Sequence, residues 1–219
     1  MRLTLFDLDH TILNGDSDVL WCDFLIAEGL LDKDAFGARN ADMAARYQAG
    51  TVGLQAFADF YVGTLADRTP ADWQPQRQAF LDDWIIPRIT PAARARVNTH
   101  LEAGDLVVMT TATNRFITEL TAQHFGIPHL IATEPALVDG HFSGHTQGEL
   151  NMREGKVVRL KHWLQAQGLS LEACTSTAYS DSINDLPLLE SVKHPVVVDP
   201  DPLLRAEALQ RGWDVISLR

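Results

Sequence analysis

The chain has 219 residues, of which 46% are hydrophobic and 21% charged, so it can bury the core of an ordinary globular protein. Its formal net charge of −11 argues against a nucleic-acid partner, because affinity for phosphates comes from Lys and Arg. No apolar run approaches the roughly 18 residues that span a bilayer, and the start of the chain lacks the pattern of a signal peptide. The two cysteines, Cys22 and Cys174, lie far apart, which indicates no disulfide framework. We therefore expect a cytoplasmic protein without a membrane partner.

Two carboxylates occur in the first strand-like stretch, residues 3–13. Its apolar and β-branched residues predict a buried strand with Asp7 and Asp9 at the carboxyl end. Because strand side chains alternate faces, these two acids are expected to share a side, which is costly unless a cation lies between them. A divalent metal with oxygen ligands is the simplest such cation. Two solvated acids at a polar strand end are the alternative.

Residues 14–88 differ from the rest of the chain in lacking β-branched runs and showing helical periodicity. Asp16 and Ser17 can cap a helix that ends near Gly29. A second apolar helix face recurs at the expected spacing in Leu54, Phe57, Ala58 and Tyr61. This segment is predicted to be a small helical insert after the first strand.

From Thr90 onward, helix and strand patterns alternate. Thr90 and Pro91 begin a helix that Gly104 ends, and further helices are predicted over 114–125, 154–167 and 202–211. Strands are predicted over 105–109, 129–132, 178–180, 195–198 and 215–218, with a hairpin over 137–146 around Asp139-Gly140. The fold class is therefore α/β: a Rossmann-like parallel sheet with helices on both faces and a helical cap inserted after the first strand. The predicted core is 1–13 and 89–219, and the cap is 14–88.

Further chemistry-bearing residues follow other strands or begin a helix. A strand over 107–113 ends in hydroxyls, Lys156 follows Gly155 at a helix start, and a short strand precedes Asp181 and Asp185. In order, these stretches resemble the four signature motifs of the haloacid dehalogenase-like hydrolase superfamily. The first motif matches Asp7-Leu-Asp-His-Thr11, the second Thr111, the third Lys156 and the fourth the stretch 180–185. Four motifs in the right order over nearly the whole chain make a specific match.

The resemblance implies a magnesium-dependent phosphatase acting through an aspartyl-phosphate. Asp7 would be the nucleophile, and Asp9 would give a proton to the leaving alkoxide and then take one from water. Magnesium would be held by the carboxylates of Asp7 and Asp181 and the backbone carbonyl of Asp9. Asp185 would orient Lys156 or a metal-bound water.

The remaining site residues would bind the substrate. By the same resemblance, Lys156 would supply positive charge to the phosphoryl oxygens, and Thr111 with the backbone N–H groups of Ala112 and Thr113 would cradle them. Asn184 would be a further donor. The alternatives without a function are that Lys156 is a solvated lysine in the first turn of a helix, and that the hydroxyl of Thr111 only forms a hydrogen bond with the backbone.

The helical insert and the hairpin resemble the phosphoserine phosphatase-like branch of the superfamily. A rough alignment places Asp16 where those enzymes carry a cap acid, and Asp59 where they carry the Arg that suits a carboxylate; Arg46 could substitute for that Arg. Two cap acids favour a small amino-alcohol phosphate such as histidinol phosphate. Phosphoserine phosphatase and phosphomutase activities are the enzymatic alternatives, and a phosphate or metal sensor is the non-enzymatic one. A receiver-like protein would carry no helical insert.

Overall fold

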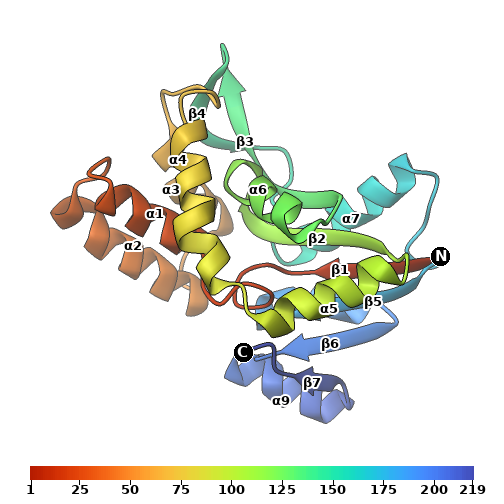
Figure 1. Cartoon of the computed structure of the whole chain (residues 1–219). Coiled ribbons are helices and arrows are strands. Elements are labelled where there is room, and N and C mark those ends of the chain that lie inside the picture. Colours follow the sequence, from red (N-terminus) through yellow and green to blue (C-terminus); the bar gives the residue numbers. More distant parts are fainter.

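The computed structural model describes residues 1–219 apart from the side chain of Gln48. Within these residues, seven strands form one sheet in the order β4-β3-β2-β1-β5-β6-β7 (Figure 1). All neighbours are parallel except the β3–β4 hairpin. The strands are β1 (Arg2–Phe6), β2 (Leu106–Asn114), β3 (His129–Val138), β4 (His141–Gln147), β5 (Thr175–Ser180), β6 (His194–Val198) and β7 (Asp214–Ile216). The predicted α/β class is confirmed.

Helices alternate with the strands from β2 onward. They are α5 (Pro91–Glu102), α6 (Arg115–Phe125), α7 (Glu154–Ala166), the short turn η4 (Ile183–Asp185), α8 (Leu186–Ser191) and α9 (Pro202–Arg211). Between β1 and α5 lie α1 (Ser17–Ala27), α2 (Lys33–Gln48), α3 (Leu54–Val62), η1 (Gly63–Leu65), α4 (Gln74–Ala79), η2 (Phe80–Ile85) and η3 (Ile86–Arg88). Among the helices described, none is long and apolar enough to cross a membrane.

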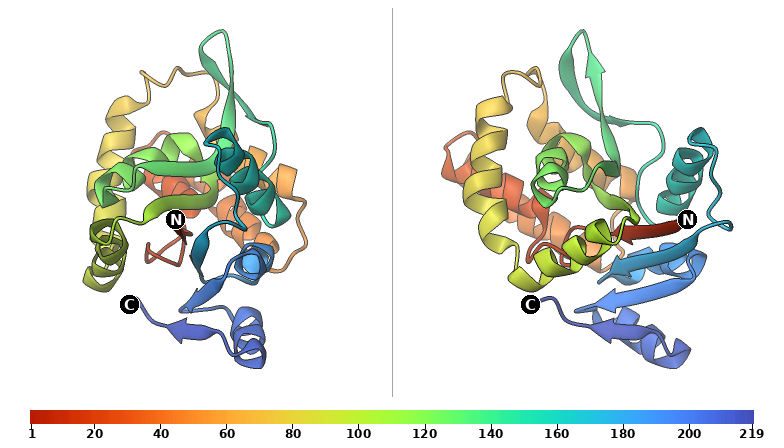
Figure 2. Two further views of the ribbon diagram at one scale, coloured as in Figure 1. Left: turned by 90° about the vertical axis from the view of Figure 1, so that its right-hand side faces the viewer. Right: turned by 45° about the vertical axis from the view of Figure 1, so that its right-hand side comes forward.

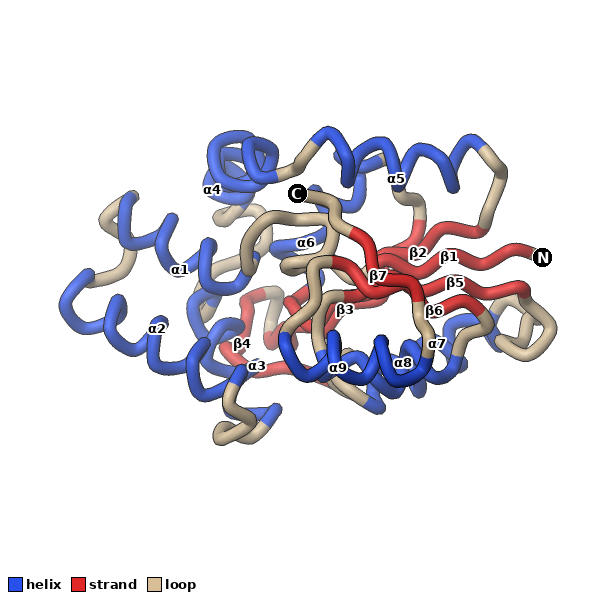
Figure 3. Tube along the Cα trace, turned by 90° about the horizontal axis from the view of Figure 1, so that it is seen from below, coloured by secondary structure: helices blue, strands red, loops and turns tan.

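The central strand β1 contributes side chains to both faces of the sheet. Leu3 and Leu5 are fully buried in an apolar cluster with residues of α7, α8 and α9, whereas Phe6 packs in a cluster with residues of α5 and α6. Figure 3 shows α5 on one side of the sheet and α7 to α9 on the other. Each such side chain stabilises the fold by about 1.5–3 kcal/mol. These two layers fix the strands whose carboxyl ends carry the predicted site.

The helical insert, residues 14–88, lies beyond the carboxyl ends of the strands, opposite the N-terminus of the chain (Figure 3). Its core surrounds Trp21, whose ring packs edge-on against Trp73 and Phe80 with centroids 5.6 and 5.1 Å away. The indole N–H of Trp21 donates to the Thr64 hydroxyl at 3.0 Å. That this insert is a separate cap domain over a core of 1–13 and 89–219 stays a prediction.

The β3–β4 hairpin projects from the edge of the sheet beside the helical insert (Figure 2). Its turn is Asp139-Gly140, both with positive φ (50° and 80°), as the sequence predicts for a tight hairpin. The carboxylate of Asp59 on α3 accepts the backbone N–H of Thr146 on β4 at 3.1 Å. This hydrogen bond links the hairpin to α3 of the helical insert.

The prediction that the strand continues to Asp9 is wrong, whereas Asp7 directly follows β1 and its N–H donates to the carbonyl of Tyr179 on β5 at 3.0 Å. β1 stops at Phe6, and the chain then folds back so that the N–H groups of Ile12 and Leu13 donate to the carbonyl of Leu8 at 3.1 and 2.9 Å. The alternation of a strand consequently does not place the two acids on one side. Two predicted strands were also too short. β2 continues to Asn114 through a register shift in its pairing with β3, and β3 continues to Val138 because it also pairs with β4.

The start of α7 is tightly constrained. A Cβ on Gly155 would collide with the carbonyl oxygen of Leu150, so the backbone approaches closely only because this residue is glycine. Two residues earlier, Arg153 has φ 49° and ψ −125°, a backbone conformation that side-chain-bearing residues rarely adopt. Such strain costs on the order of 1–3 kcal/mol and tends to occur at functional sites.

We predict that Arg153→Gly is more stable than Arg153→Ala by about 1 kcal/mol, because both lose the guanidinium and only glycine relieves the strained φ. Urea unfolding of the two variants measures the difference. The matched control is Glu154, the first residue of α7, where glycine should instead be less stable than alanine by about 0.5–1 kcal/mol. An alanine variant at 153 as stable as the glycine variant would show that the strain is absent.

Candidate active site

A cavity of about 430 Å³ lies at the carboxyl ends of the central strands, under the helical insert. Nearly all of the residues predicted from the sequence line it: Asp7, Asp9, Asp16, Ala112, Thr113, Lys156, Asp181, Asn184 and Asp185. Thr111 is fully buried and does not itself line the cavity, unlike its neighbour Ala112. The structure thus brings together segments from both ends of the chain, as expected for parallel strands whose carboxyl ends meet.

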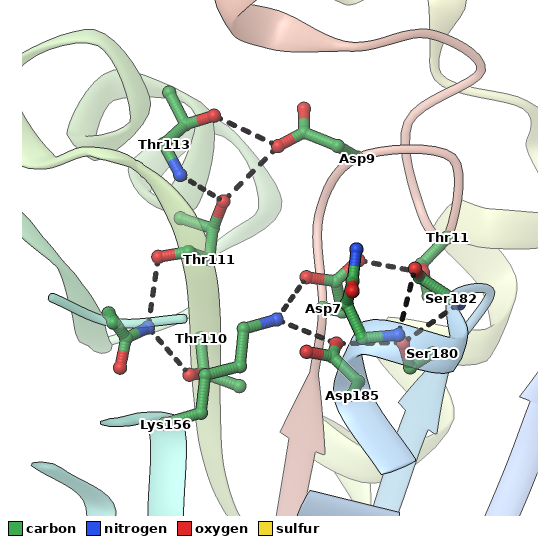
Figure 4. Close-up of polar contacts among 12 residues, drawn as sticks. Asp7, Asp9, Thr11, Thr110, Thr111, Thr113, Lys156, Ser180, Ser182 and Asp185 are labelled. Carbon is green, nitrogen blue, oxygen red and sulfur yellow. Dashed lines mark hydrogen bonds and ion pairs between the residues drawn. The ribbon is translucent and has the colours of Figure 1, made fainter. Parts of the chain in front are cut away.

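The ammonium of Lys156 lies at the centre of the cluster. It donates to Asp7 Oδ1 at 2.7 Å and to Asp185 Oδ2 at 2.6 Å, and the residue is only 2% exposed (Figure 4). Burial disfavours the charged form, but the two carboxylates outweigh burial and raise the pKa of Lys156 above its ordinary value. Lys156 is therefore a fixed positive charge, and the alternative of a solvated lysine is wrong.

One hydroxyl joins two of the carboxylates. Thr11 Oγ1 lies 2.9 Å from Asp7 Oδ2 and 3.1 Å from Asp181 Oδ1. A hydroxyl has a single proton, so it can satisfy only one of these oxygens at a time. Burial, against the opposing charge of Lys156, raises the pKa of Asp7 to about 7, and burial together with Asp7 raises the pKa of Asp181 well above its usual range. The cluster holds more negative charge than its own cations balance.

This donor set fits a magnesium ion. No three His, Cys, Asp or Glu side chains of the described residues converge on one point as a complete protein cage would require. Magnesium, however, is usually bound by one or two carboxylates and keeps several waters. Asp7 and Asp181 provide that arrangement, because both offer carboxylate oxygens as metal ligands. The single hydroxyl proton of Thr11 can bond to only one of these two carboxylates.

Asp9 faces a different set of partners. Its Oδ1 accepts the backbone N–H of Ser17 at 2.6 Å, and its Oδ2 accepts the hydroxyls of Thr113 and Thr111 at 3.0 and 3.2 Å. Figure 4 shows its carboxylate directed at the two threonines and away from Lys156. The backbone N–H of Thr113 donates to Thr111 Oγ1 at 3.2 Å. The roles predicted for these residues stay predictions.

Asp16 is the N-cap of α1. Its Oδ1 accepts the backbone N–H groups of Asp18 and Val19, both at 3.0 Å. Burial and the neighbouring Asp9 raise the pKa of Asp16 to about 7. Asp59 and Arg46, which the alignment also singled out, do not line this cavity. Asp59 accepts a hydrogen bond from β4, and Arg46 pairs with Asp42 on α2 at 3.6 Å.

The sequence reasoning missed several residues that line the cavity. Arg153 lies there with its Nε donating to Asn184 Oδ1 at 3.2 Å, and Asp18 follows the N-cap of α1. An apolar wall comprises Met152 and the stacked rings of Tyr47 and Phe57, whose centroids are 3.9 Å apart. An acid in the first turn of a helix reads as ordinary capping, and no sequence pattern indicates the positive φ of Arg153.

Comparisons with known proteins agree with this geometry. A sequence model of the haloacid dehalogenase-like hydrolase family matches residues 4–190. A histidinol-phosphatase of Neisseria meningitidis serogroup C (strain 8013) is 38% identical over 220 residues, covering 100% of this chain and 99% of the relative. Phosphoserine phosphatase SerB1 of Mycobacterium tuberculosis (strain ATCC 25618 / H37Rv) is 31% identical, covering 98% of this chain and 70% of the relative.

A solved structure has nearly the same fold. The crystal structure of a protein with unknown function from Bordetella pertussis Tohama I is 45% identical, covers 100% of this chain and 99% of its own, and gives a TM-score of 0.95. The family match spans all four motifs, from Asp7 to Asp185. The resemblance drawn from those motifs is confirmed: the chain belongs to the haloacid dehalogenase-like hydrolase family.

Proposed function

We propose that the protein is a magnesium-dependent phosphatase that hydrolyses a small phosphate monoester through an aspartyl-phosphate on Asp7. The observation that carries the proposal is the buried ammonium of Lys156 between Asp7 and Asp185, with Asp181 beside them, on the wall of one cavity. Phosphate monoesters hydrolyse extremely slowly in water, so a site of this kind must supply a very large acceleration.

The proposed reaction has two displacements on phosphorus. The carboxylate of Asp7 attacks the phosphorus atom, the bond to the alcohol oxygen breaks, and Asp9 gives its proton to the departing alkoxide. Water then attacks the phosphorus of the aspartyl-phosphate and transfers its proton to Asp9. Inorganic phosphate leaves, and the carboxylate of Asp7 is restored.

Asp9 must change partners for this role. In the structure its carboxylate accepts three hydrogen bonds, from the N–H of Ser17 and the hydroxyls of Thr111 and Thr113. To carry a proton to the leaving group it has to give up the threonine hydroxyls and turn into the cavity that it already lines. We propose that this turn accompanies substrate binding, and that the released hydroxyl of Thr111 or Thr113 then serves the phosphoryl oxygens.

The other residues hold charge in place. Lys156 favours the ionised form of Asp7 against the effect of burial and presents a cation to the phosphoryl group, and Asp185 fixes the ammonium in position. The carboxylates of Asp7 and Asp181 with the backbone carbonyl of Asp9 would hold magnesium, which when bound offsets the negative charge of nucleophile and phosphate. The backbone of Ala112 and Thr113 and the amide of Asn184 would complete the phosphate site.

We propose an amino-alcohol phosphate, histidinol phosphate first, as the substrate. The support is the 38% identity to a histidinol-phosphatase over essentially both full lengths. The cavity also combines acids of α1, Asp16 and Asp18, with a flat apolar wall of Tyr47 and Phe57. Residues 14–88, which carry these four side chains, would act as the cap that selects the substrate.

Phosphoserine is the second candidate, and one residue favours it. A carboxylate-bearing substrate needs a cation outside the phosphate site, and the guanidinium of Arg153 lines the cavity. Arg153 would therefore supply the cation that the alignment does not provide at Asp59. The 31% identity to a phosphoserine phosphatase supports the same alternative.

We expect Asp7→Asn to lower kcat by at least about 10⁴-fold while leaving the fold intact, because the amide keeps the shape and loses the nucleophile. Release of inorganic phosphate from an aryl phosphate, with and without Mg²⁺, is the measurement. Asp139→Asn makes the same exchange in the hairpin turn, where Asn-Gly is equally suitable, and should retain full activity. Single turnover by the natural protein would instead indicate a receiver, and no reaction a sensor.

Among small phosphate esters, kcat/KM for histidinol phosphate should exceed that for phosphoserine by at least about tenfold, because two buried acids repel the carboxylate of phosphoserine. Steady-state kinetics on both compounds tests this. Arg153→Met should leave the preference in place, because the guanidinium of Arg153 would bind a carboxylate and histidinol phosphate has none. A preference for phosphoserine that Arg153→Met abolishes would establish the second candidate.

The metal-free protein should lose stability as pH rises from about 5 to 7.5. The pKa values of Asp7 and Asp16 are raised from 3.8 to about 7, so in this window the folded state binds more protons than the unfolded state. The melting temperature in EDTA should fall by about 2–4 °C per kcal/mol lost, and Mg²⁺ at pH 7.5 should restore it. Asp16→Asn should flatten the slope. A melting temperature that rises with pH across this window, at constant ionic strength, would contradict the expectation.

A further inference from the structure

Asp18 is a buried carboxylate with one oxygen, Oδ1, that no hydrogen bond in the described part of the chain satisfies. It lies in the first turn of α1, lines the substrate cavity and is only 4% exposed. Within the described residues its Oδ1 has no hydrogen-bond partner, and no Lys, Arg or His forms an ion pair with it. A buried carboxylate left in this state is costly, which makes a missing partner the natural explanation.

The two neighbouring acids are in a different situation. Asp16 caps α1 through two backbone N–H groups, and Asp9 accepts a backbone N–H and two hydroxyls. The hydroxyl of Thr113 lies next to both Asp18 and Asp9 and has a single proton, which it donates to Asp9 Oδ2 at 3.0 Å. Three acids therefore lie around the start of α1 and line the cavity, and among them only Asp18 has a buried oxygen without a hydrogen-bond partner among the residues that the structure describes.

We propose that Asp18, and not Asp16, binds the cationic amine of the substrate, while Tyr47 and Phe57 pack against its flat apolar part. This inference rests on the proposed function and assigns the recognition of the amine within it. An ammonium carries donors and no acceptor, so it suits a carboxylate that has acceptors to spare. Burial, with the charges of Asp16 and Asp9, raises the pKa of Asp18, and an ammonium beside it would restore the ionised form.

A competing partner lies on the other side of Asp18. The hydroxyl of Tyr61 and the amide nitrogen of Asn114 also lack partners, and both border a narrow void that Asp18 closes. This void leaves no room for a water molecule. A small shift could let these two groups donate to Asp18, which would make Asp18 a purely structural residue. The two roles differ in what substitution of Asp18 does to substrate selectivity.

The test compares one substrate with its analogue lacking the amine. The substrates are histidinol phosphate and 3-(imidazol-4-yl)propyl phosphate, and the readout is the ratio of their kcat/KM values in the natural protein and in Asp18→Asn. Loss of a hydrogen bond to a charged group corresponds to about 10- to 100-fold. We expect the ratio to favour the amine in the natural protein and to fall by about that factor in Asp18→Asn.

Two matched variants make the same charge change nearby. Asp16→Asn keeps the helix cap, because Asn caps as well as Asp, and should keep the ratio within about threefold of the natural protein. Asp23→Asn lies on the exposed side of α1, where Asp23 accepts from Asn40, and should leave ratio and activity unchanged. A fall of the ratio in Asp16→Asn alone would overturn the assignment in favour of the acid that the alignment indicates.

The remaining outcomes separate failure of this inference from failure of the proposed function. If the ratio of Asp18→Asn is that of the natural protein and its melting temperature falls, Asp18 serves Tyr61 and Asn114, and the inference is wrong. If the natural protein hydrolyses neither compound, the proposed substrate class fails first. Should Asp18→Asn not fold, inhibition of the natural protein by free histidinol and by the amine-free alcohol replaces the variant, and equal inhibition by both would overturn the inference.

Discussion

The buried ammonium of Lys156 is the interaction on which the site depends. It joins the end of β1, the first turn of α7 and the turn η4 through Asp7 and Asp185, at 2.7 and 2.6 Å. Removing one member of such a buried pair typically costs about 3–5 kcal/mol, yet an apolar replacement of the whole group is often no less stable. The arrangement is therefore poorly explained by stability, and its position on the cavity wall favours a chemical role. Gly155 makes it possible, because a side chain there would push α7 away from Leu150.

Charge around Lys156 is unbalanced, and this imbalance shapes what the cavity can bind. Asp9 and Asp16 are partly compensated by the backbone N–H groups at the start of α1, where the helix dipole also favours negative charge. Asp7 and Asp181 share the single proton of Thr11. A phosphate ester approaching a protein of net charge −11 meets repulsion until cations offset it locally. The same surplus of acid makes the site suitable for a divalent metal near β1 and an ammonium near α1.

Much of the fold could be predicted because local signals and global topology agree. Thr90-Pro91 begins α5, Asp139-Gly140 forms the hairpin turn, and parallel strands bring four distant motifs to one edge of the sheet. The prediction failed at Asp9, because the turn that closes on the carbonyl of Leu8 has no sequence signature that separates it from the preceding strand. Arg153 was missed because no sequence pattern indicates its positive φ, which occurs in the short stretch where Gly155 approaches the carbonyl of Leu150.

The contrast between Asp16 and Asp18 shows what a sequence alignment leaves out. An alignment assigns a position to each acid but not a hydrogen-bond partner, and a helix start has a fixed number of N–H groups to offer. The residue at the N-cap takes two of them at 3.0 Å, so its charge is already engaged before any substrate arrives. Asp18 lies two residues later in the first turn, and Oδ1 of its carboxylate accepts no hydrogen bond from the described residues. The geometry of α1 therefore decides which of the two acids keeps an unsatisfied oxygen, and on the proposed function that acid would set the selectivity for the amine.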